Sequence, residues 1–271
     1  MPFSQQDTID YYNSFGDVYE LVWNQQVHTG YFDTDKSLEA AVEDMTTYLA
    51  SLLELRPGMI VLNVGSGQGG VDRFLVDNFN VHSIGIDISK KQIEKATTQA
   101  AEQGLTEKIR YIEASMTNIP LEKETVDVVW VQESFFHCHD KPKALHEFYR
   151  VLKPGGAIII EDTVLKNVQV KQEILETFGE RVKINELWTQ EDYLKNMEKS
   201  GFVVEQTKDF SQYLSITYAK IIEFIRNNKS TLATKIPEMY KKALEHDFNF
   251  PLTLEFVREN KIGCLVLVAK K

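Results

Sequence analysis

The sequence predicts an α/β fold in which a doubly wound, mostly parallel sheet carries helices on both faces. Three observations indicate this fold. An apolar segment at 60–64 leads into the glycine-rich turn GSGQGG and then into a helical segment. Short apolar strands alternate with helix-forming segments from there to about residue 162, and glycine or Pro-Gly stops end the helices at 104 and 153–156. Strands and helices that alternate at this spacing build a parallel sheet of the Rossmann type.

The turn at residues 65–70 predicts a nucleotide-binding site. The strand before it is apolar except for Asn63, and apolar residues recur with helical spacing after it. Glycine adopts positive φ angles and lets a ligand approach the backbone closely. The free N–H groups at the start of the following helix then face whatever lies above the turn.

The glycines leave two ligand classes open. Gly65, Gly67 and Gly70 fit the dinucleotide pattern G-x-G-x-x-G, and Asp87 follows Gly67 by 20 residues. The same turn fits the G-x-G-x-G form used for S-adenosylmethionine, because both ligands place a ribose beside an acidic residue at the end of the second strand. An NAD(P)-dependent oxidoreductase is therefore an alternative at this point.

The composition is typical of a soluble globular chain. Its 271 residues are 43% hydrophobic and 26% charged, which suits one domain with an added cap. The net charge of −10 argues against nucleic acid or an anionic membrane as the main partner. Cys138 and Cys264 lack disulfide or metal spacing, and the sequence has neither a leader pattern nor a membrane-length apolar run. We therefore expect a cytoplasmic protein with a small-molecule substrate, and homodimer formation is an option.

Strand and helix signals follow one another through the first 165 residues. Ser37 caps a predicted helix over 38–54, and Ser89 with Gln92 forms a capping box at the start of another. Asp140 is expected near the N-cap of the helix that ends at Lys-Pro-Gly-Gly. The predicted strands are 60–64, 81–87, 109–113, 126–131 and 157–160.

The two ends of the chain depart from this alternation of strands and helices. Residues 1–36 are aromatic-rich and are expected to be irregular, although Tyr11, Phe15 and Tyr19 would share one helical face. After residue 162 we predict a helix from Thr189, a strand at 202–207, helices over 210–248 and a last strand at 263–269.

These patterns divide the chain into four parts. Residues 1–56 are expected to form an N-terminal lid and helix, and residues 57–209 the nucleotide-binding core. Residues 210–260 interrupt the last two strands, so they form either a cap over the ligand or a dimer contact, of which we favour the cap. Residues 261–271 supply the last strand.

Five motifs in order resemble the class I S-adenosylmethionine-dependent methyltransferases across about residues 58–165. They are VLNVGSGQGG, GIDIS, ASMTNIP, DVVWVQESFFH and RVLKPGGAIIIED. The N-terminal YYNSFGDVYELVWNQQVHTGYF and the segment QESFFHCHDK are most similar to the small-molecule branch that includes sarcosine and dimethylglycine N-methyltransferases, with tocopherol and sterol C-methyltransferases close by. The resemblance implies a seven-stranded sheet whose last strand is antiparallel, with the cofactor over the strand ends.

The resemblance also implies roles for individual residues. Asp87 would bind both ribose hydroxyls, the glycine turn the methionine part, and Ile88 the adenine; the N-terminal lid would close over the sulfonium. The implied cofactor contacts are Gly65, Ser66, Gly67, Asp87, Ile88, Gln92, Ser115, Met116, Gln132, Tyr19, His28 and Thr29. Asn63 and Ser115 stand where the family usually has acidic residues, but each can still form hydrogen bonds, Asn63 with the glycine turn.

Methyl transfer mainly requires a nucleophile held in line and shielded from water, since the methyl of a sulfonium is already a good electrophile. An amine acceptor must be neutral when it attacks, so a base within reach helps. His137 is the first choice for this base, with Asp162 as an orienting or binding carboxylate and Glu133 as a substrate contact. All three follow the fourth and fifth strands, where such sheets bind substrates.

Other functional classes remain open. The leading prediction is N-methyl transfer to a small amine, with carbon or oxygen acceptors close behind. The oxidoreductase named above and a binder that holds the cofactor without transfer are the alternatives. His137-Cys138-His139-Asp140 lacks a second cluster to complete a tetrahedral metal site, so we predict no metal.

Overall fold

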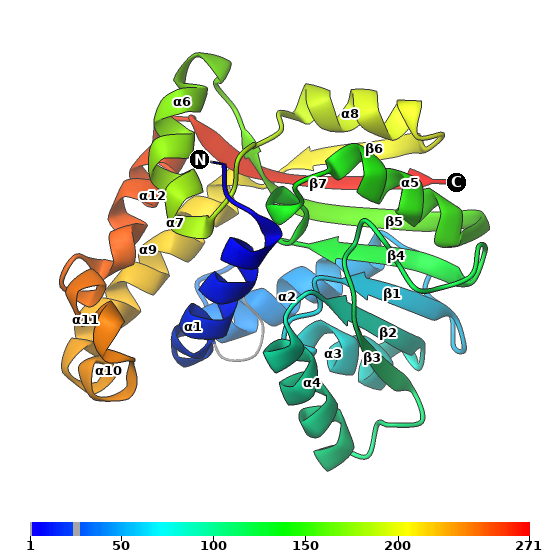
Figure 1. Cartoon of the computed structure of the whole chain (residues 1–271), viewed down its shortest axis with the longest axis horizontal. Coiled ribbons are helices and arrows are strands. Elements are labelled where there is room, and N and C mark those ends of the chain that lie inside the picture. Colours follow the sequence, from blue (N-terminus) through cyan, green and yellow to red (C-terminus); the bar gives the residue numbers. More distant parts are fainter. Residues whose placement is uncertain (1, 24–27) are drawn as a thin grey trace.

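A seven-stranded sheet forms the centre of the protein in the computed structural model, which describes residues 2–23 and 28–271. The strand order is β3-β2-β1-β4-β5-β7-β6, as Figure 1 shows. Only β7 runs antiparallel, and it lies between β5 and β6. The strands are β1 Ile60–Val64, β2 His82–Asp87, β3 Ile109–Glu113, β4 Val126–Gln132, β5 Leu152–Leu165, β6 Val203–Asp209 and β7 Ile262–Lys270. The predicted α/β fold, doubly wound and mostly parallel, is confirmed.

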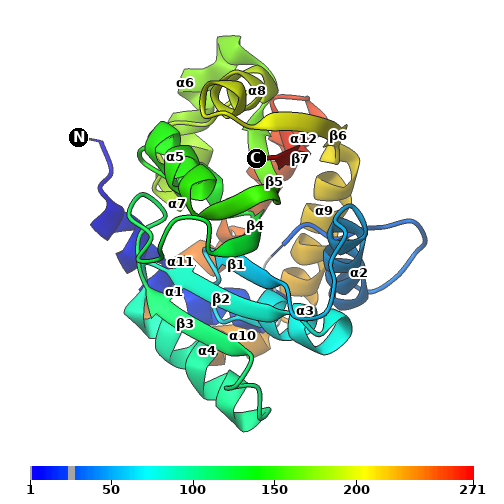
Figure 2. The same cartoon turned by 90° about the vertical axis from the view of Figure 1, so that its right-hand side faces the viewer.

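Helices cover both faces of the sheet. Figure 2 shows α5 and α8 on one side of the sheet and α2, α3 and α9 on the other, with α4 beside β3 at the end of the sheet. The helices are α1 Gln5–Trp23, α2 Leu38–Ser51, α3 Gly70–Phe79, α4 Lys90–Glu102, α5 Lys141–Val151, α6 Lys171–Ile174, α7 Glu180–Val182, α8 Gln190–Lys199, α9 Ser211–Asn227, α10 Lys229–Lys235, α11 Glu238–Glu245 and α12 Phe250–Arg258. Alternate residues of the central strands pack into separate apolar clusters on the two faces, as the period of two in a strand requires.

Predicted caps form at most helix starts. Ser37 accepts a hydrogen bond from the N–H of Ala40, and Asp140 accepts one from Lys143. Thr189 begins α8 with a complete capping box. Ser89 Oγ accepts the N–H of Gln92 at 3.2 Å, but the Gln92 side chain does not return to the cap. The box expected at α4 is therefore only half formed.

Two elements differ from the sequence prediction. The expected strand at 157–160 extends to Leu152–Leu165, because Leu152 pairs with Val126 of β4 and Leu165 pairs with Ile262 of β7. Lys-Pro-Gly-Gly lies inside this strand as an irregularity in the pairing with β4, where Gly155 adopts a φ of 75°. The irregular N-terminus that we predicted is also wrong, since residues 5–23 form the single helix α1.

Helix α1 packs between the sheet and the helices at 211–258. Phe15 and Tyr19 are buried in a third apolar cluster together with Ile221, Phe248 and Phe250. The rings of Phe15 and Tyr19 lie 4.9 Å apart, and Phe15 lies 5.2 Å from Phe248. The shared helical face predicted for the aromatic residues thus packs against α9 and the segment before α12.

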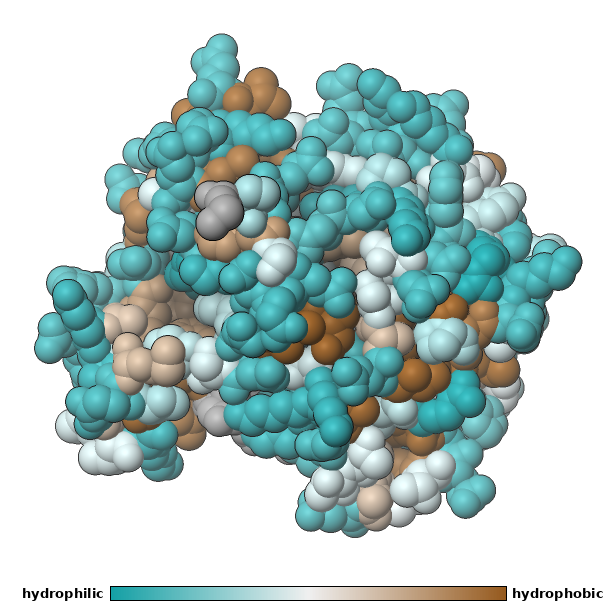
Figure 3. All heavy atoms as spheres, in the orientation of Figure 1, coloured by the Kyte–Doolittle hydropathy of each residue, from teal (hydrophilic) through white to brown (hydrophobic). Residues whose placement is uncertain are grey.

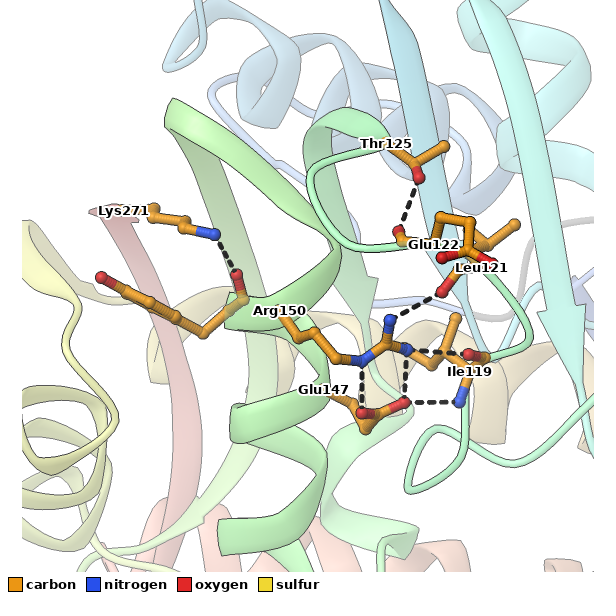
Figure 4. Close-up of polar contacts among 8 residues, drawn as sticks. Ile119, Leu121, Glu122, Thr125, Glu147, Arg150 and Lys271 are labelled. Carbon is orange, nitrogen blue, oxygen red and sulfur yellow. Dashed lines mark hydrogen bonds and ion pairs between the residues drawn. The ribbon is translucent and has the colours of Figure 1, made fainter.

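The loop between β3 and β4 is held by the end of α5. Arg150 donates hydrogen bonds to the carbonyls of Leu121 and Ile119 at 2.6 and 2.9 Å, as Figure 4 shows. Glu147 binds the same guanidinium at 2.7 Å and accepts the N–H of Ile119 at 2.8 Å. The loop that these bonds fix begins with residues 114–117, which belong to the site described next.

Within 2–23 and 28–271, no helix has both the length and the apolar character needed to cross a bilayer.

Candidate functional site

A cavity opens at the carboxyl ends of β1, β2 and β4, beneath α1. Its wall combines the glycine turn, the end of β2, the start of the β3–β4 loop and the segment after β4. Eleven of the twelve predicted cofactor residues line it: Gly65, Ser66, Gly67, Asp87, Ile88, Gln92, Ser115, Met116, Gln132, Tyr19 and His28. The surface in Figure 3 is mostly hydrophilic, with apolar atoms visible in the hollow beside α1. Ligands of open α/β sheets bind at this edge.

The glycine turn brings the backbone against the cavity. Gly65 and Gly67 have φ angles of 72° and 52°, which glycine adopts at little cost. The N–H groups of Gly65 and Ser66 both donate to the carbonyl of Ile86, at 2.8 and 2.9 Å. A Cβ on Gly65 would lie 2.4 Å from the Cβ of Ser134, so no side chain fits there without movement.

Asp87 occupies the end of β2 with both carboxylate oxygens hydrogen-bonded to backbone. One accepts the N–H of Gly67 at 3.0 Å and the other that of Ser89 at 2.8 Å. Burial raises the pKa of Asp87, and the backbone N–H groups oppose that rise. Because each carboxylate oxygen accepts more than one hydrogen bond, acceptor sites remain for a ribose diol in the cavity.

A buried polar group supports the turn from below. Asn63 donates through its amide to Asp72 at 2.8 Å, and the hydroxyl of Ser83 donates to the other oxygen at 2.5 Å. The hydrogen bond that we expected between Asn63 and the glycine turn is replaced by this bond to α3. Burial raises the pKa of Asp72 to about 6.

Helix α1 closes the far side of the cavity through contacts with two segments, the start of α4 and the residues after β4. Asn13 Oδ1 accepts the hydroxyl of Ser89 at 2.7 Å, and Thr8 lies 3.4 Å from His139. A Cβ on Gly16 would meet the amide of Gln92 at 2.7 Å, so glycine permits this approach of α1 to α4. Sequence reasoning assigned none of these α1 residues to the site.

The cavity wall offers polar groups that the protein itself leaves without a partner. Six lining residues each keep one buried side-chain atom with no hydrogen bond within the described part of the chain. These atoms are His28 Nδ1, Ser66 Oγ, Gln68 Oε1, Gln92 Oε1, Gln132 Nε2 and His137 Nδ1. Buried polar groups without partners are rare in folded proteins. Their concentration around one cavity fits a ligand rich in polar groups, as an adenosyl amino acid is.

His137 lies in a turn of 3-10 helix after β4 and contacts Tyr12 of α1. The Tyr12 hydroxyl and His137 Nε2 are 2.6 Å apart. Burial, together with the positive charges of Lys141 and Arg181, lowers the pKa of His137 to about 3. Burial raises the pKa of Tyr12 well above its ordinary value of 10. Both groups are therefore neutral at physiological pH, and His137 is a weaker base than an ordinary histidine.

Glu133 faces the same cavity from a strained backbone position. Its φ of 45° lies in the left-handed region, which residues other than glycine rarely adopt. The N–H of Thr29 donates to Glu133 Oε1 at 2.7 Å, and the Thr29 hydroxyl donates to the same oxygen. Burial raises the pKa of Glu133, and it lies close to the buried Glu161. Thr29, the twelfth predicted cofactor residue, is thus bound to Glu133 and is absent from the cavity wall.

Asp162 lies behind the cavity instead of in its wall. It is fully buried and accepts the hydroxyl of Tyr193. Burial raises its pKa to about 8, while the hydrogen bond from Tyr193 and the charge of Lys141 oppose the rise. This position allows Asp162 to influence neighbouring side chains but gives it no contact with a ligand in the cavity.

Sequence reasoning did not identify Arg181, which is separated from the cavity by the ring of Tyr19. Arg181 of α7 stacks on Phe178 and Phe250, with its guanidinium carbon 5.3 and 4.9 Å from the ring centres. Its charge lowers the pKa of Tyr19, against the larger effect of burial. Arg181 donates to Thr253 at 3.2 Å, but within the described residues it has no ion pair with a carboxylate. Arg181 could not be identified from the sequence, because no motif lies in or before α7.

The segment His137-Cys138-His139-Asp140 does not gather metal ligands. Among the residues that the structure describes, no three His, Cys, Asp or Glu side chains are grouped so that they could hold a metal ion. His139 lies 3.1 Å from the amide of Asn185, and Asp140 caps α5.

Comparison with known proteins identifies what this site is similar to. A family model described as a methyltransferase domain matches residues 62–160. A glycine/sarcosine/dimethylglycine N-methyltransferase of Actinopolyspora halophila is 28% identical over 236 residues, covering 86% of this chain and 42% of that protein. A 27-O-demethylrifamycin SV methyltransferase of Amycolatopsis mediterranei is also 28% identical, covering 96% of this chain and 95% of that protein. The chain thus spans about two fifths of the first relative and nearly all of the second.

A solved structure extends the similarity over the whole chain. A Galdieria sulphuraria protein assigned as a sarcosine dimethylglycine methyltransferase superposes with a TM-score of 0.82 at 26% identity. The match covers 98% of this chain and 97% of that one. The glycine turn therefore lies within a methyltransferase domain, and the nicotinamide alternative gains no support.

Proposed function

Because the chain belongs to the class I S-adenosylmethionine-dependent methyltransferases, we propose that it methylates the nitrogen of a small amine that also carries an acidic group. Glu133 at the cavity carries this proposal for the amine end. Arg181, whose guanidinium is bound by hydroxyl groups and, within the described residues, by no carboxylate, carries it for the acidic end. The N-methyltransferase of Actinopolyspora halophila, named for glycine, sarcosine and dimethylglycine, acts on acceptors of this class.

S-adenosylmethionine would supply an electrophilic methyl group at the carboxyl ends of β1 and β4. The glycine turn would hold the amino acid part, Asp87 the ribose, and Ile88 with Met116 the adenine. Tyr19 and His28 would cover the sulfonium, and an aromatic face attracts a cation. The six buried polar atoms without partners support this assignment, since a bound cofactor would satisfy groups that otherwise cost free energy.

Glu133 is the residue that we assign to the amine. An ammonium group would pair with its carboxylate, and a carboxylate of raised pKa is better suited to take the proton that must leave before nitrogen attacks. The two hydrogen bonds from Thr29 fix the side chain in place. We assign this proton to Glu133 and not to His137, whose pKa of about 3 makes it a weak acceptor.

Tyr12 and His137 would orient the acceptor. A neutral His137 would accept a hydrogen bond from the Tyr12 hydroxyl through Nε2. The lone pairs of the Tyr12 oxygen would then stay available to the cavity. That oxygen can accept an N–H bond of the amine and so direct the nitrogen lone pair toward the methyl group. Positioning of this kind supplies a large part of the rate in transfer reactions.

Arg181 would bind the acidic group. Arg181 is partly buried, and its known partners are neutral hydroxyl groups, so an anion beside it would supply the missing counter-charge. The rings of Phe178 and Phe250 cover part of the guanidinium, and its planar donors suit a carboxylate or phosphate. A movement of Tyr19 would join this pocket to the cavity. Carbon and oxygen acceptors stay as alternatives, and the rifamycin relative is an O-methyltransferase by name.

The helices at 211–258 would act as a cap on the acceptor pocket. Phe248 and Phe250 pack against the aromatic face of α1, and Phe250 also stacks on Arg181. These contacts tie the segment to the same pocket, which favours a cap over a dimer contact.

Labelled methyl transfer to a matched panel tests the acceptor class. The purified protein is incubated with methyl-labelled cofactor and with glycine, sarcosine, dimethylglycine and phosphoethanolamine, each against a neutral amine of similar size. A simple phenol and an isoprenoid alcohol complete the panel. We expect label only in amines with an acidic group. Label in the phenol or the alcohol alone would overturn the proposal.

A substitution locates the anion subsite. Arg181→Gln should raise KM for an acidic amine by about 10- to 100-fold, since a charge-assisted hydrogen bond contributes about 1.5–3 kcal/mol. The affinity for S-adenosylhomocysteine should stay within about twofold. Arg258→Gln, at an exposed position of α12, is the matched control. An unchanged KM in Arg181→Gln would remove this residue from acceptor binding.

A further inference from the structure

The first residue of α5 is a lysine whose side chain is enclosed by protein. Lys141 is 2% exposed, and burial lowers the pKa of its ammonium group. Lysine is almost never fully buried unless its charge is compensated. The loop and helix signals of the sequence account for Asp140 and Pro142 at this helix start, but they do not require a buried cation here.

The ammonium group of Lys141 is bound to backbone carbonyls. It donates to Cys138 at 3.0 Å, to Phe136 at 3.3 Å and to Glu186 at 3.5 Å. It also lies 5.7 Å from the ring centre of Trp188. Two of these carbonyls belong to the residues on either side of His137. Lys141 therefore joins the turn that carries His137 to the segment before α8.

The charge of Lys141 is balanced only at a distance. Within the described part of the chain it has no ion pair, although the charges of Asp162 and Glu186 act on it. Asp162 is bound to Tyr193, and a carboxylate oxygen of Glu186 accepts the indole N–H of Trp188 at 2.9 Å. Each carboxyl group is thus bound by another side chain, and the donors of Lys141 are directed at backbone carbonyls, two of which flank His137.

We propose that Lys141 is a positioning residue for methyl transfer, which fixes the peptide groups on both sides of His137 and so holds the imidazole against Tyr12. The inference rests on the proposed function in one respect, the orientation of the acceptor by Tyr12. The proposal also explains why a cation is buried at this place. Three backbone carbonyls converge on the same position, and the ammonium group of lysine has three N–H donors to bind them.

Lys141 also acts on the protonation of His137. The charged or titratable groups that face the imidazole are Tyr12 from α1, His139 from its own turn, Lys141 from α5 and Arg181 from α7. Burial keeps the imidazole neutral, and Lys141 has the largest influence after burial. A neutral imidazole accepts the Tyr12 hydroxyl, whereas an imidazolium could not.

The replacement Lys141→Met tests the proposal, with Lys141→Arg as the variant that keeps the charge. Met has a similar length but neither charge nor donors. We expect kcat to fall by about 10- to 100-fold in Lys141→Met, because a displaced group near the acceptor costs that much. The KM for cofactor should change by less than about threefold. Lys141→Arg should recover part of kcat. Lys143→Met, exposed in the same helical turn, is the control.

A second readout does not depend on methyl transfer. NMR titration of His137 in the ligand-free protein should show a neutral ring from pH 5 to 8 in the wild type, and a pKa displaced upward in Lys141→Met. An unchanged His137 titration together with an unchanged kcat would overturn the proposal. If the wild type methylates no amine, the proposed function fails while the titration still decides the role of Lys141. If Lys141→Met does not fold, Lys141→Arg is measured alone. His137 should then stay neutral from pH 5 to 8, and a charged imidazole in Lys141→Arg would overturn the proposal.

Discussion

Asp72 is the buried carboxyl group that supports the glycine turn. Its raised pKa predicts that the stability of the fold depends on pH. Its pKa is about 6 in the folded protein, against an ordinary value of 3.8. An acid whose pKa is higher in the folded than in the unfolded chain favours folding at low pH. That contribution is complete below about pH 4 and is lost as the pH rises through 6.

The expected size is about 3 kcal/mol, because each tenfold change in acidity corresponds to about 1.4 kcal/mol. Unfolding free energies of the wild type and of Asp72→Asn, measured at pH 4 and pH 7.5, check this. The variant should lose overall stability, since it has one acceptor fewer for Asn63 and Ser83. The difference between the two proteins should be larger at pH 4. An equal difference at both pH values would show that Asp72 does not titrate in this range.

Tyr12 is the residue whose hydroxyl we expect to matter most for turnover. Tyr12→Phe removes the partner of His137 and the oxygen that we assign to orienting the acceptor. We predict a fall in kcat of about 10- to 100-fold at nearly constant cofactor affinity. Tyr11→Phe is the matched control, since the Tyr11 hydroxyl is bound to that of Tyr19, at 2.7 Å, and not to His137. Equal kcat values in the two variants would exclude Tyr12 from the mechanism.

Residues of the site could be predicted where their motif is local. The turn at 65–70 and Asp87 lie within 23 residues of one another and are fixed by strand and turn geometry, so pattern reasoning found them. Tyr12 and Arg181 are brought to the same place by α1 and α7, far apart in the sequence. No short pattern signals such a contact. Asp162 was misjudged in a different way, since the strand continues past it and turns its side chain into the core.

At the scale of elements, the bonds between α5 and the loop after β3 predict a loss of stability. Arg150→Met leaves the carbonyls of Ile119 and Leu121 without their donor. Partly buried acceptors that lose their partners cost about 1–3 kcal/mol in total. Chemical denaturation should therefore show a lower free energy of unfolding in this variant. Arg110→Met, at an exposed position of β3, should stay within about 0.5 kcal/mol of the wild type. A similar loss in both variants would contradict a specific role for Arg150.

Element boundaries were predictable where a cap or a turn defines them. Ser37, Ser89, Asp140 and Thr189 each begin a helix as their side chains suggest. The carboxyl end of β5 was not predictable, because it depends on pairing with β7 about 100 residues later. Residues 1–36 were misread for a related reason: the helix α1 gains much of its stability by packing its aromatic face on α9 and the segment before α12.

At the scale of the whole molecule, the protein is a mostly parallel sheet with a cavity at the carboxyl ends of its strands and an aromatic helix closing it. Helix α1 contacts α4, the turn after β4 and the helices at 211–258. A ligand in the cavity would therefore bridge the sheet and the segments over it. Such a ligand stabilises the folded state in proportion to the logarithm of its concentration over Kd.

Isothermal titration of the wild type and of Asp87→Asn with S-adenosylhomocysteine and with NADH tests the central claim most directly. We predict that the wild type binds S-adenosylhomocysteine and not NADH. Asp87→Asn should bind it about 10- to 100-fold more weakly, because a charged acceptor for the ribose diol is lost. Binding of NADH alone, or equal affinity of both proteins for S-adenosylhomocysteine, would contradict the account.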